Sequence, residues 1–284
     1  MKPRVLLSLL FSTLLFALLG CETTQSGAAR APRSDPAIYD SEVAKAEALG
    51  RLIYFHDQLA WVATDMLMTY YIGLEEHQLA GWIDVETDEG WVVKYLEQAD
   101  GKPRILTEIL FPGPVNTDLS ASPLPDPVLR DPEVTELTEA EDIMLRAHYG
   151  VVAVAEEEGV CDENTNHTVF ANPYGEGYLA YALTPFRGEA TVRLGGYFRI
   201  NVAQDGSYLA GRRFANSCLE MTPEDLPKDT ELSHYMITHF LDPHPTEIHV
   251  FLSLQHPMPL LVLTPQGQLW EVNAGKITPV NLKK

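Results

Sequence analysis

The hydrophobic patterns in the first half of the chain are the feature that most constrains its fold. From Asp40 to about Tyr70, apolar residues recur every three or four positions, which predicts a helix that Asp40 can cap. From Gly81 to Phe111 the pattern alternates instead, with turn signals at Glu89-Gly90 and Asp100-Gly101. We therefore predict a helix followed by a meander of three antiparallel strands.

A proline-rich stretch follows the meander. Residues 112 to 132 carry six prolines and show no periodicity, and proline has no N–H to donate to a sheet. We interpret this stretch as a surface connection and as the best candidate for a subdomain boundary. Thr138 and Glu141 then form a capping-box pattern before an apolar stripe that ends near Gly159, so a second, central helix is expected.

Short β-rich runs make up most of the chain beyond Cys161. Glycines, prolines and a hairpin signal at Asp205-Gly206 separate these runs. The sequence thus predicts an α+β fold with a predominantly antiparallel β-sheet, an N-terminal helix and a central helix. We expect a helix plus meander over 37–111, a connection over 112–135 and a helix plus sheet over 136–284, with the two folded parts packed as one domain.

The first residues carry the pattern of an export signal. Lys2 and Arg4 precede an apolar run from Val5 to Leu19, as in the charged and apolar regions of a secretory signal. The run covers roughly 22 Å as a helix, which is short of a hydrocarbon core of about 30 Å, so a permanent span is disfavoured. The run leads into Leu18-Leu19-Gly20-Cys21, which resembles the lipobox of bacterial lipoproteins.

The lipobox resemblance implies that residues 1–20 are a signal peptide, and that Cys21 carries a covalent lipid and an acylated amino terminus. Several acyl chains make membrane attachment lasting. Glu22 stands where aspartate commonly marks inner-membrane retention, which favours the outer membrane with the folded part facing the periplasm. Residues 21–36 are mostly small and polar, which predicts a flexible tether. An ordinary secretory signal and an uncleaved anchor are the alternatives.

The charge of the chain limits its partners. It has 40 acidic and 20 basic residues and a formal net charge of −20. Nucleic acid phosphates and anionic lipids repel such a chain, so neither is expected to bind it, and attachment to the membrane is assigned to the lipid on Cys21. We interpret the acidic surface as a solvated one, with the binding of cations or basic partners as the alternative.

Two cysteines remain once Cys21 is assigned to lipid. Cys161 and Cys218 belong to the exported part, and an oxidising compartment favours a disulfide between them. In the chain-entropy model such a bond stabilises the fold by roughly 4 kcal/mol. A nucleophilic cysteine is the alternative, and it needs a matched histidine to which the sequence does not point.

None of the strong catalytic signatures occurs in the sequence. G-x-S-x-G, H-E-x-x-H, G-x-x-x-x-G-K-[ST], C-x-x-C and G-x-G-x-x-G are all absent. Asp57 and Asp65, on either side of Trp61, mark the most functional-looking segment of the first helix. About 12 Å of helical rise separates the two residues, too far for a shared proton, so we interpret Asp65 as a polar residue on the helix flank.

Five of the nine histidines lie in the segment 233–256. We predict a strand over 246 to 254, paired in a hairpin with the residues before it. His239 faces His249 across this ladder in one register, and faces Ile248 after a slip of one residue.

The turn of this hairpin holds the one metal site that the sequence suggests. His244, between two prolines, can approach Glu247 and His249, and the three side chains form a weak set of zinc ligands. Histidines at a rim with ordinary hydrogen bonds are the preferred interpretation. No cofactor besides the lipid on Cys21 is expected.

The folded part resembles the many proteobacterial envelope lipoproteins to which no function is assigned. We expect a non-enzymatic module, anchored in the outer membrane, that binds or scaffolds an envelope protein through exposed sheet edges or the proline-rich connection. The first alternative is a periplasmic metal-dependent hydrolase that uses His244, Glu247 and His249. The second is a carrier of small ligands, which needs a large apolar cavity.

Overall fold

The first helix forms where its apolar stripe predicts it. In the computed structural model, α1 spans Asp40–Tyr70 and follows a short 3-10 helix, η1, Pro36–Tyr39. The prediction that Asp40 caps α1 was wrong. Asp35 caps η1 by accepting a hydrogen bond from the Ala37 N–H. Asp40 is the first residue of α1, where its negative charge interacts favourably with the helix dipole. The structure describes residues 35–189, 191–222 and 233–281.

The three-stranded meander is confirmed. Its first turn is Asp88-Glu89, one residue before the predicted signal, and its second is Asp100-Gly101, as predicted. Asp100 and Gly101 both have positive φ, as a type I′ turn requires. The strands pair antiparallel in chain order: β1 (Leu79–Thr87), β2 (Gly90–Ala99) and β3 (Lys102–Pro112).

The proline-rich connection contributes one strand to this sheet. Its residues Val128–Arg130 form β4, which pairs antiparallel with β3 at the sheet edge. The prediction that the stretch supplies no strand was therefore wrong for these three residues. None of them is proline, so each keeps its backbone N–H, and the flanking prolines are tolerated because the strand lies at an edge.

The second helix forms as predicted. α2 spans Glu139–Glu158, and its capping box is complete because Thr138 accepts from the Glu141 N–H while the Glu141 carboxylate accepts from the Thr138 N–H at 2.8 Å. α2 packs on the antiparallel sheet β5-β6-β8-β9. The strands here are β5 (Asn166–Ala171), β6 (Tyr178–Leu183), β8 (Phe198–Val202) and β9 (Tyr208–Arg213), while β7 (Val192–Leu194) pairs with β10 (Leu219–Met221).

The C-terminal part contains the largest departure from prediction. Residues 246 to 254 were predicted as a strand, but Glu247–Gln255 form the helix α3. This helix connects β11 to β12, which pair in parallel, so the predicted antiparallel hairpin does not form. The sheet has the order β11-β12-β13-β14, with β11 (Tyr235–Thr238), β12 (Leu260–Leu263), β13 (Leu269–Asn273) and β14 (Lys276–Val280).

Burial on every side of α3 explains why its sequence resembles a strand. Ile248, Val250 and Leu252 alternate as strand residues would, but His249 and Phe251 between them are buried as well. A helix that is buried all round shows no apolar stripe, so its period cannot be told from that of a buried strand. The Thr246 N–H donates to Nδ1 of His249 at 3.0 Å, which completes a capping box without glutamate.

The predicted fold class is confirmed. Within the described residues, three α-helices and fourteen strands form an α+β fold, and every strand pair except β11–β12 is antiparallel. All of these elements belong to one compact unit, Arg33–Lys284. The helix that the prediction lacks is α3.

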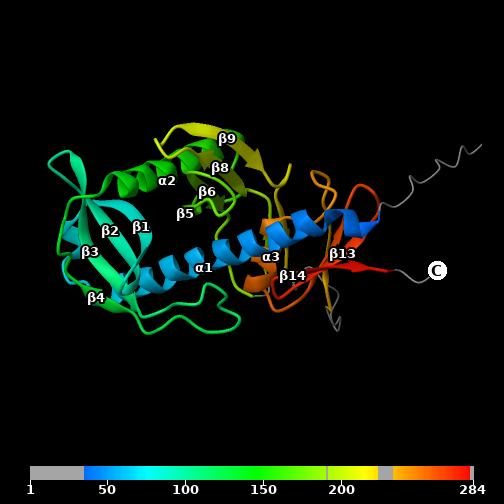
Figure 1. Cartoon of the computed structure of the whole chain (residues 1–284), viewed down its shortest axis with the longest axis horizontal. Coiled ribbons are helices and arrows are strands. Elements are labelled where there is room, and N and C mark those ends of the chain that lie inside the picture. The colour runs from blue at the N-terminus through cyan, green and yellow to red at the C-terminus, as the bar shows by residue number, and fades with distance from the viewer. Residues whose placement is uncertain (1–34, 190, 223–232, 282–284) are drawn as a thin grey trace, which may run out of the picture. The chain divides into compact units, whose positions relative to one another are not determined.

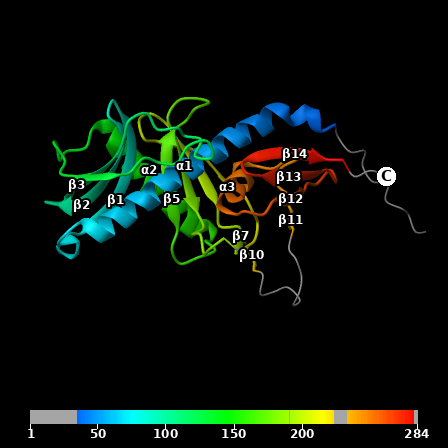
Figure 2. The same cartoon turned by 90° about the horizontal axis from the view of Figure 1, so that it is seen from below.

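Helix α1 joins two hydrophobic cores within this unit. Figures 1 and 2 show its N-terminal end near β13 and β14 and its C-terminal end beside the meander. Leu49 and Ile53 belong to the core that includes α3 and the C-terminal sheet, whereas Phe55 and Leu59 belong to the core under the meander. The position of α1 therefore fixes both cores at once.

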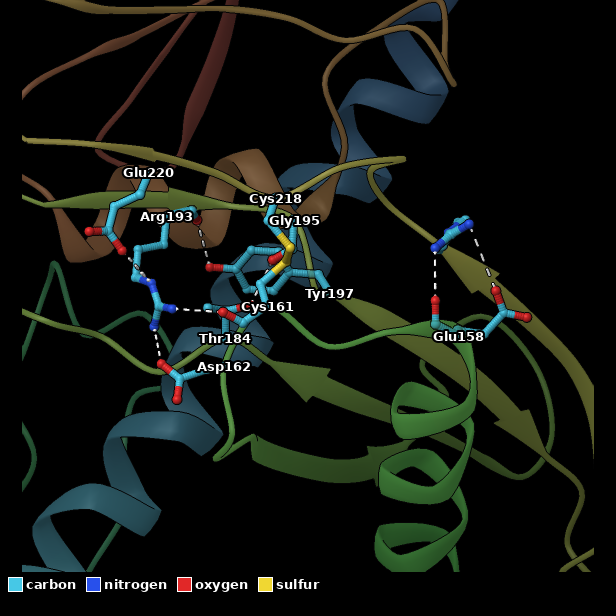
Figure 3. The surroundings of a disulfide bond; sticks show 10 residues. Glu158, Cys161, Asp162, Thr184, Arg193, Gly195, Tyr197, Cys218 and Glu220 are labelled. Carbon is cyan, nitrogen blue, oxygen red and sulfur yellow. Dashed lines mark hydrogen bonds and ion pairs between the residues drawn. A yellow bond between two sulfur atoms is a disulfide. The ribbon is translucent and has the colours of Figure 1, made fainter.

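Cys161 and Cys218 form the predicted disulfide. Figure 3 shows the bond beside Arg193 of β7, whose guanidinium donates to the Cys161 carbonyl oxygen at 3.0 Å. The same guanidinium pairs with Asp162 at 2.6 Å and with Glu220 of β10 at 3.1 Å. Ion pairs thus reinforce the covalent link between the segment after α2 and the β7–β10 pair.

The close packing of α1 against α3 requires glycine at position 50. A Cβ atom at Gly50 would lie 2.4 Å from Val250 Cβ and 2.7 Å from the carbonyl oxygen of Glu247. Both separations are far below a normal contact, and the α3 backbone cannot rotate out of the way as a side chain can. Gly50 lowers the intrinsic helix propensity of α1 by about 1 kcal/mol, and its absent side chain permits the contact.

Gly50→Ala is expected to reduce the free energy of unfolding by about 2 kcal/mol, because the added methyl group forces α1 and α3 apart. Gly150→Ala in α2 is the matched control. There the added Cβ would meet the flexible Ile200 Cδ1 at 3.4 Å, so this variant is expected to be neutral or more stable. Urea unfolding followed by circular dichroism measures both. A Gly50→Ala variant as stable as the parent would contradict the account of this contact.

Candidate ligand-binding cavity

A cavity of about 820 Å³ lies where α1, the C-terminal end of α3 and the start of β5 meet. We call it the Asp57 cavity. Trp61 and Phe186 are exposed, with ring centroids 6.5 Å apart, so they mark its solvent side. This volume, with aromatic and polar groups together, is typical of sites for small molecules. The aromatic lining residues are Tyr54, Trp61, Trp82 and Phe186, and the side-chain amides are Gln58, Asn166, Gln255 and Asn273.

Three of these amides lie close enough to the carboxyl group of Asp57 to favour its charged form. Gln58 is its neighbour on α1, Asn166 is the first residue of β5, and Gln255 is the last residue of α3. Removal from water outweighs the effect of the three amides and raises the pKa of Asp57 to about 6. Asp57 thus carries a charge at pH 7 that its surroundings disfavour.

The sequence singles out Asp57 but none of the groups from β5 and α3 that surround it. Asn166 and Gln255 are distant in sequence, and a single amide in a strand or helix has no distinguishing pattern. Gln255 also lies at the end of a segment that was predicted as a strand. Asp65, the second acid of the helix segment, is exposed and does not line the Asp57 cavity, in line with its interpretation as a flank residue.

Two histidines form a pair next to Trp82. The ring centroids of His148 and His167 lie 4.7 Å apart, and the Trp82 ring meets His167 edge-on at 4.3 Å. Burial lowers the pKa of His167 to about 4 and holds the pKa of His148 well below its usual value, so both rings are neutral at pH 7. Within the described chain, neither nitrogen of His148 has a hydrogen-bond partner. The pair therefore supplies no positive charge to the cavity, which His167 lines.

A histidine–aspartate pair lies beside the cavity but is not part of it. His56 Nδ1 bonds to the carboxylate of Asp84 on β1, and the imidazole stacks on Phe170 with ring centroids 4.8 Å apart. Both side chains are buried and neither lines the Asp57 cavity. Because consecutive helix residues point about 100° apart, His56 joins α1 to the meander while Asp57 faces the cavity.

The predicted metal ligands are held by separate partners. Nδ1 of His244 meets a neighbouring backbone carbonyl oxygen at 2.9 Å, Glu247 pairs with Arg199 at 2.6 Å, and His249 caps α3 through Thr246. Across the described residues, no group of three or more His, Cys, Asp or Glu side chains is arranged to hold a metal ion. His244, Glu247 and His249, the weak candidate ligands, thus do not form one group in the described structure.

His239 and His249 do meet, although not across a strand ladder. Their ring centroids lie 4.7 Å apart, with His239 directly after β11 and His249 in the first turn of α3. His239 Nε2 contacts Asp242 at 2.8 Å, and Asp242 also pairs with Arg212 at 2.7 Å. Both predicted registers were wrong, since no hairpin forms here.

Ser253 and His256 line the Asp57 cavity without forming a nucleophile and base. The Ser253 hydroxyl donates to the Val250 carbonyl oxygen at 2.7 Å and accepts from the Gly275 N–H at 3.0 Å. Nδ1 of His256 contacts the Glu189 carbonyl oxygen at 2.9 Å. The serine is thus bonded to backbone groups in place of an imidazole, and the arrangement does not support acyl transfer.

Cys21 and the whole lipobox-like segment lie outside the described residues. Over the ranges that the structure does describe, no helix combines the length and the apolar content needed to cross a membrane. Comparison of the chain with models of known families, with curated proteins and with solved structures finds no match. The features that bear on function are therefore the lipobox-like segment Leu18-Leu19-Gly20-Cys21 and the Asp57 cavity.

Asp57→Asn is expected to raise the free energy of unfolding at pH 8 by about 1–3 kcal/mol. The folded state raises the pKa of this carboxyl group from 3.8 to about 6, so Asp57 contributes stability below pH 4 that is lost as the pH rises through 6. Asparagine has no charge to bury, so the gain in the free energy of unfolding should shrink as the pH falls toward 4.

Urea unfolding at pH 4 and pH 8 measures this difference, with Asp65→Asn as the control at an exposed position of the same helix. The control should change stability by less than about 0.5 kcal/mol at either pH. An Asp57→Asn variant that loses stability equally at both pH values would show that the carboxylate is not under strain.

Proposed function

We propose that this protein is a lipoprotein of the outer membrane, anchored through Cys21 and facing the periplasm, whose folded part binds a small molecule in the Asp57 cavity. The lipobox-like segment Leu18-Leu19-Gly20-Cys21 supports the anchor. The disulfide between Cys161 and Cys218 suits an oxidising compartment. The observation that carries the binding function is the cavity of about 820 Å³ around a carboxyl group of raised pKa.

Binding, rather than catalysis, is the function that these groups support. The cavity offers aromatic rings and amides, which orient and enclose a ligand. Ser253 is bonded to backbone groups, and the ligands of the alternative metal-dependent hydrolase are held by other partners. Of the alternatives raised by the sequence, a carrier of small ligands therefore agrees best with the geometry.

A protein partner in the envelope is a second candidate function, favoured by one edge of the sheet. Tyr208 and Leu209 of the edge strand β9 are exposed by 57% and 61%. An exposed edge with apolar side chains can add a strand from another chain. Such a contact would lie outside the Asp57 cavity, whose lining residues do not include β9.

Cys21→Ser tests the anchor. Without the thiol the lipid cannot be attached, so the variant should appear in the soluble periplasmic fraction or stay as an uncleaved precursor. Fractionation of cells and immunoblotting measure this. A variant that is cleaved normally and still sediments with the outer membrane would contradict the lipobox interpretation.

Ala60→Trp tests the binding function by filling the cavity, which Ala60 lines from α1. The parent protein, incubated with a periplasmic extract, washed and denatured, should release a small molecule that mass spectrometry detects, and Ala60→Trp should not. Ala153→Trp, on the exposed side of α2, controls for the added indole. Equal release from all three proteins, or release from none, would contradict a binding function of this cavity.

A further inference from the structure

The charges around the Asp57 cavity are unbalanced. Asp57 and Glu189 line it, whereas no lysine or arginine does so among the residues that the structure describes. The imidazoles of His167 and His256 also line it, but burial lowers the pKa of each, that of His167 to about 4. At neutral pH the cavity therefore presents negative charge without a balancing side-chain cation.

The nearest arginine on the same helix is already paired. Arg51 bonds to Asp118 at 2.9 Å and to the carbonyl oxygens of Ala274 and Gly275 at 3.3 and 3.2 Å. These contacts engage its guanidinium, Asp118 neutralises it, and Arg51 is not among the residues that line the cavity. Arg51 thus does not serve as the counter-charge of Asp57.

Other acids that are buried in the described part of the fold are paired with basic side chains. Glu108 and Glu141 pair with Lys94, Glu247 pairs with Arg199, and Asp84 pairs with His56. Each of these buried acids thus has a basic partner, as the cost of burying a charge demands.

Asp57 differs from these acids, because it is half-buried at the cavity wall and has no such partner among the described residues. The side chains that favour its charged form are the neutral amides of Gln58, Asn166 and Gln255. No basic side chain in the described ranges forms an ion pair with it. It is also the acid that faces a cavity large enough for an organic molecule. The cation that its neighbours lack can therefore come from a ligand.

The remaining walls suit a ligand with a cationic group and a hydrocarbon part. The faces of aromatic rings attract ammonium groups, and Tyr54, Trp61, Trp82 and Phe186 line the cavity. Each of the amides around Asp57 also has a carbonyl oxygen, which can accept an ammonium N–H. The net charge of −20 adds a field that raises the concentration of cations near the chain.

We propose that the Asp57 cavity binds an organic cation, with an ammonium group paired to the Asp57 carboxylate and its hydrocarbon part against the aromatic rings. This inference rests on the proposed binding function and names its ligand class. The absence of a three-ligand cluster in the described residues and the size of the cavity favour an amine over a metal ion.

The affinity of the Asp57 cavity for an organic cation should depend on pH. An ammonium group pairs with the carboxylate and not with the carboxylic acid, so affinity should be close to full by about pH 7 and fall as the pH drops through 6. The other ionisable groups on the cavity walls are Tyr54, His167, His256 and Glu189. Since those groups remain in Asp57→Asn, the variant separates the contribution of Asp57 from theirs.

The test is a titration of the full mature protein in detergent. Binding is monitored by tryptophan fluorescence, to which Trp61 and Trp82 of the cavity contribute, and by calorimetry. The probes are putrescine, spermidine and choline, with 1,4-butanediol as the neutral analogue of putrescine and succinate as an anion. At pH 7.5 at least one cation should bind, and butanediol and succinate should bind about tenfold more weakly or not at all.

Asp57→Asn should weaken cation binding by about tenfold or more and abolish its fall below pH 6. Asp65→Asn, which changes the net charge equally at an exposed position, should bind like the parent. Thermal unfolding of each variant shows that it is folded under the conditions of the titration.

Failure of all three cations to bind, binding of butanediol as tight as that of putrescine, or an unchanged affinity in Asp57→Asn would overturn the proposal. These results leave the binding function in place if a different molecule is still released by the parent and not by Ala60→Trp. Release of nothing from the parent is the separate result that overturns the binding function itself.

Discussion

The contact between α1 and α3 at Gly50 is the constraint on which the rest of the structure depends. The missing side chain allows the two helices to approach until Gly50 meets Val250 and the backbone of Glu247. Further along the same pair, Asp57 of α1 meets Gln255 at the end of α3, so the two helices run past each other in the same direction. The close approach thus places an acid from one helix beside an amide from the other, at the wall of the cavity.

Helix α1 explains how a stable fold can hold the Asp57 carboxylate in surroundings that disfavour its charge. α1 contributes Leu49 and Ile53 to one core and Phe55 and Leu59 to another, and its backbone position is therefore strongly determined. A helix held in this way can present a carboxyl group where water is scarce, although the charge opposes folding. Sites that bind or react commonly carry such a local penalty, which the surrounding fold offsets.

Much of the fold could be predicted from local patterns. The stripe of α1, the alternation of the meander and the capping box of α2 each act within a few residues, so the sequence displays them directly. α3 could not be predicted, because its residues are buried on every side and leave no stripe. Strand β4 was not predicted because prolines on both sides argue against a strand, although the three residues between them can pair at a sheet edge.

The site was less predictable than the fold. Asp57 stood out in its helix, but the amides of Asn166 and Gln255 reach it from elements distant in sequence, and no spacing links them. The composition of the histidine-rich segment suggested a metal site. In the structure its side chains cap a helix or bond to nearby groups. Tertiary packing, and not a motif, assembles the cavity, so only the folded chain reveals it.

The pKa of the Asp57 carboxyl group, measured by carbon NMR with Asp57→Asn to assign the signal, tests the central claim most directly. The account predicts a value of about 6 in the free protein. It also predicts a lower value in the presence of a saturating organic cation such as putrescine, because the ammonium group favours the carboxylate. A value near 4 in the free protein, or one that no bound cation changes, would contradict the account.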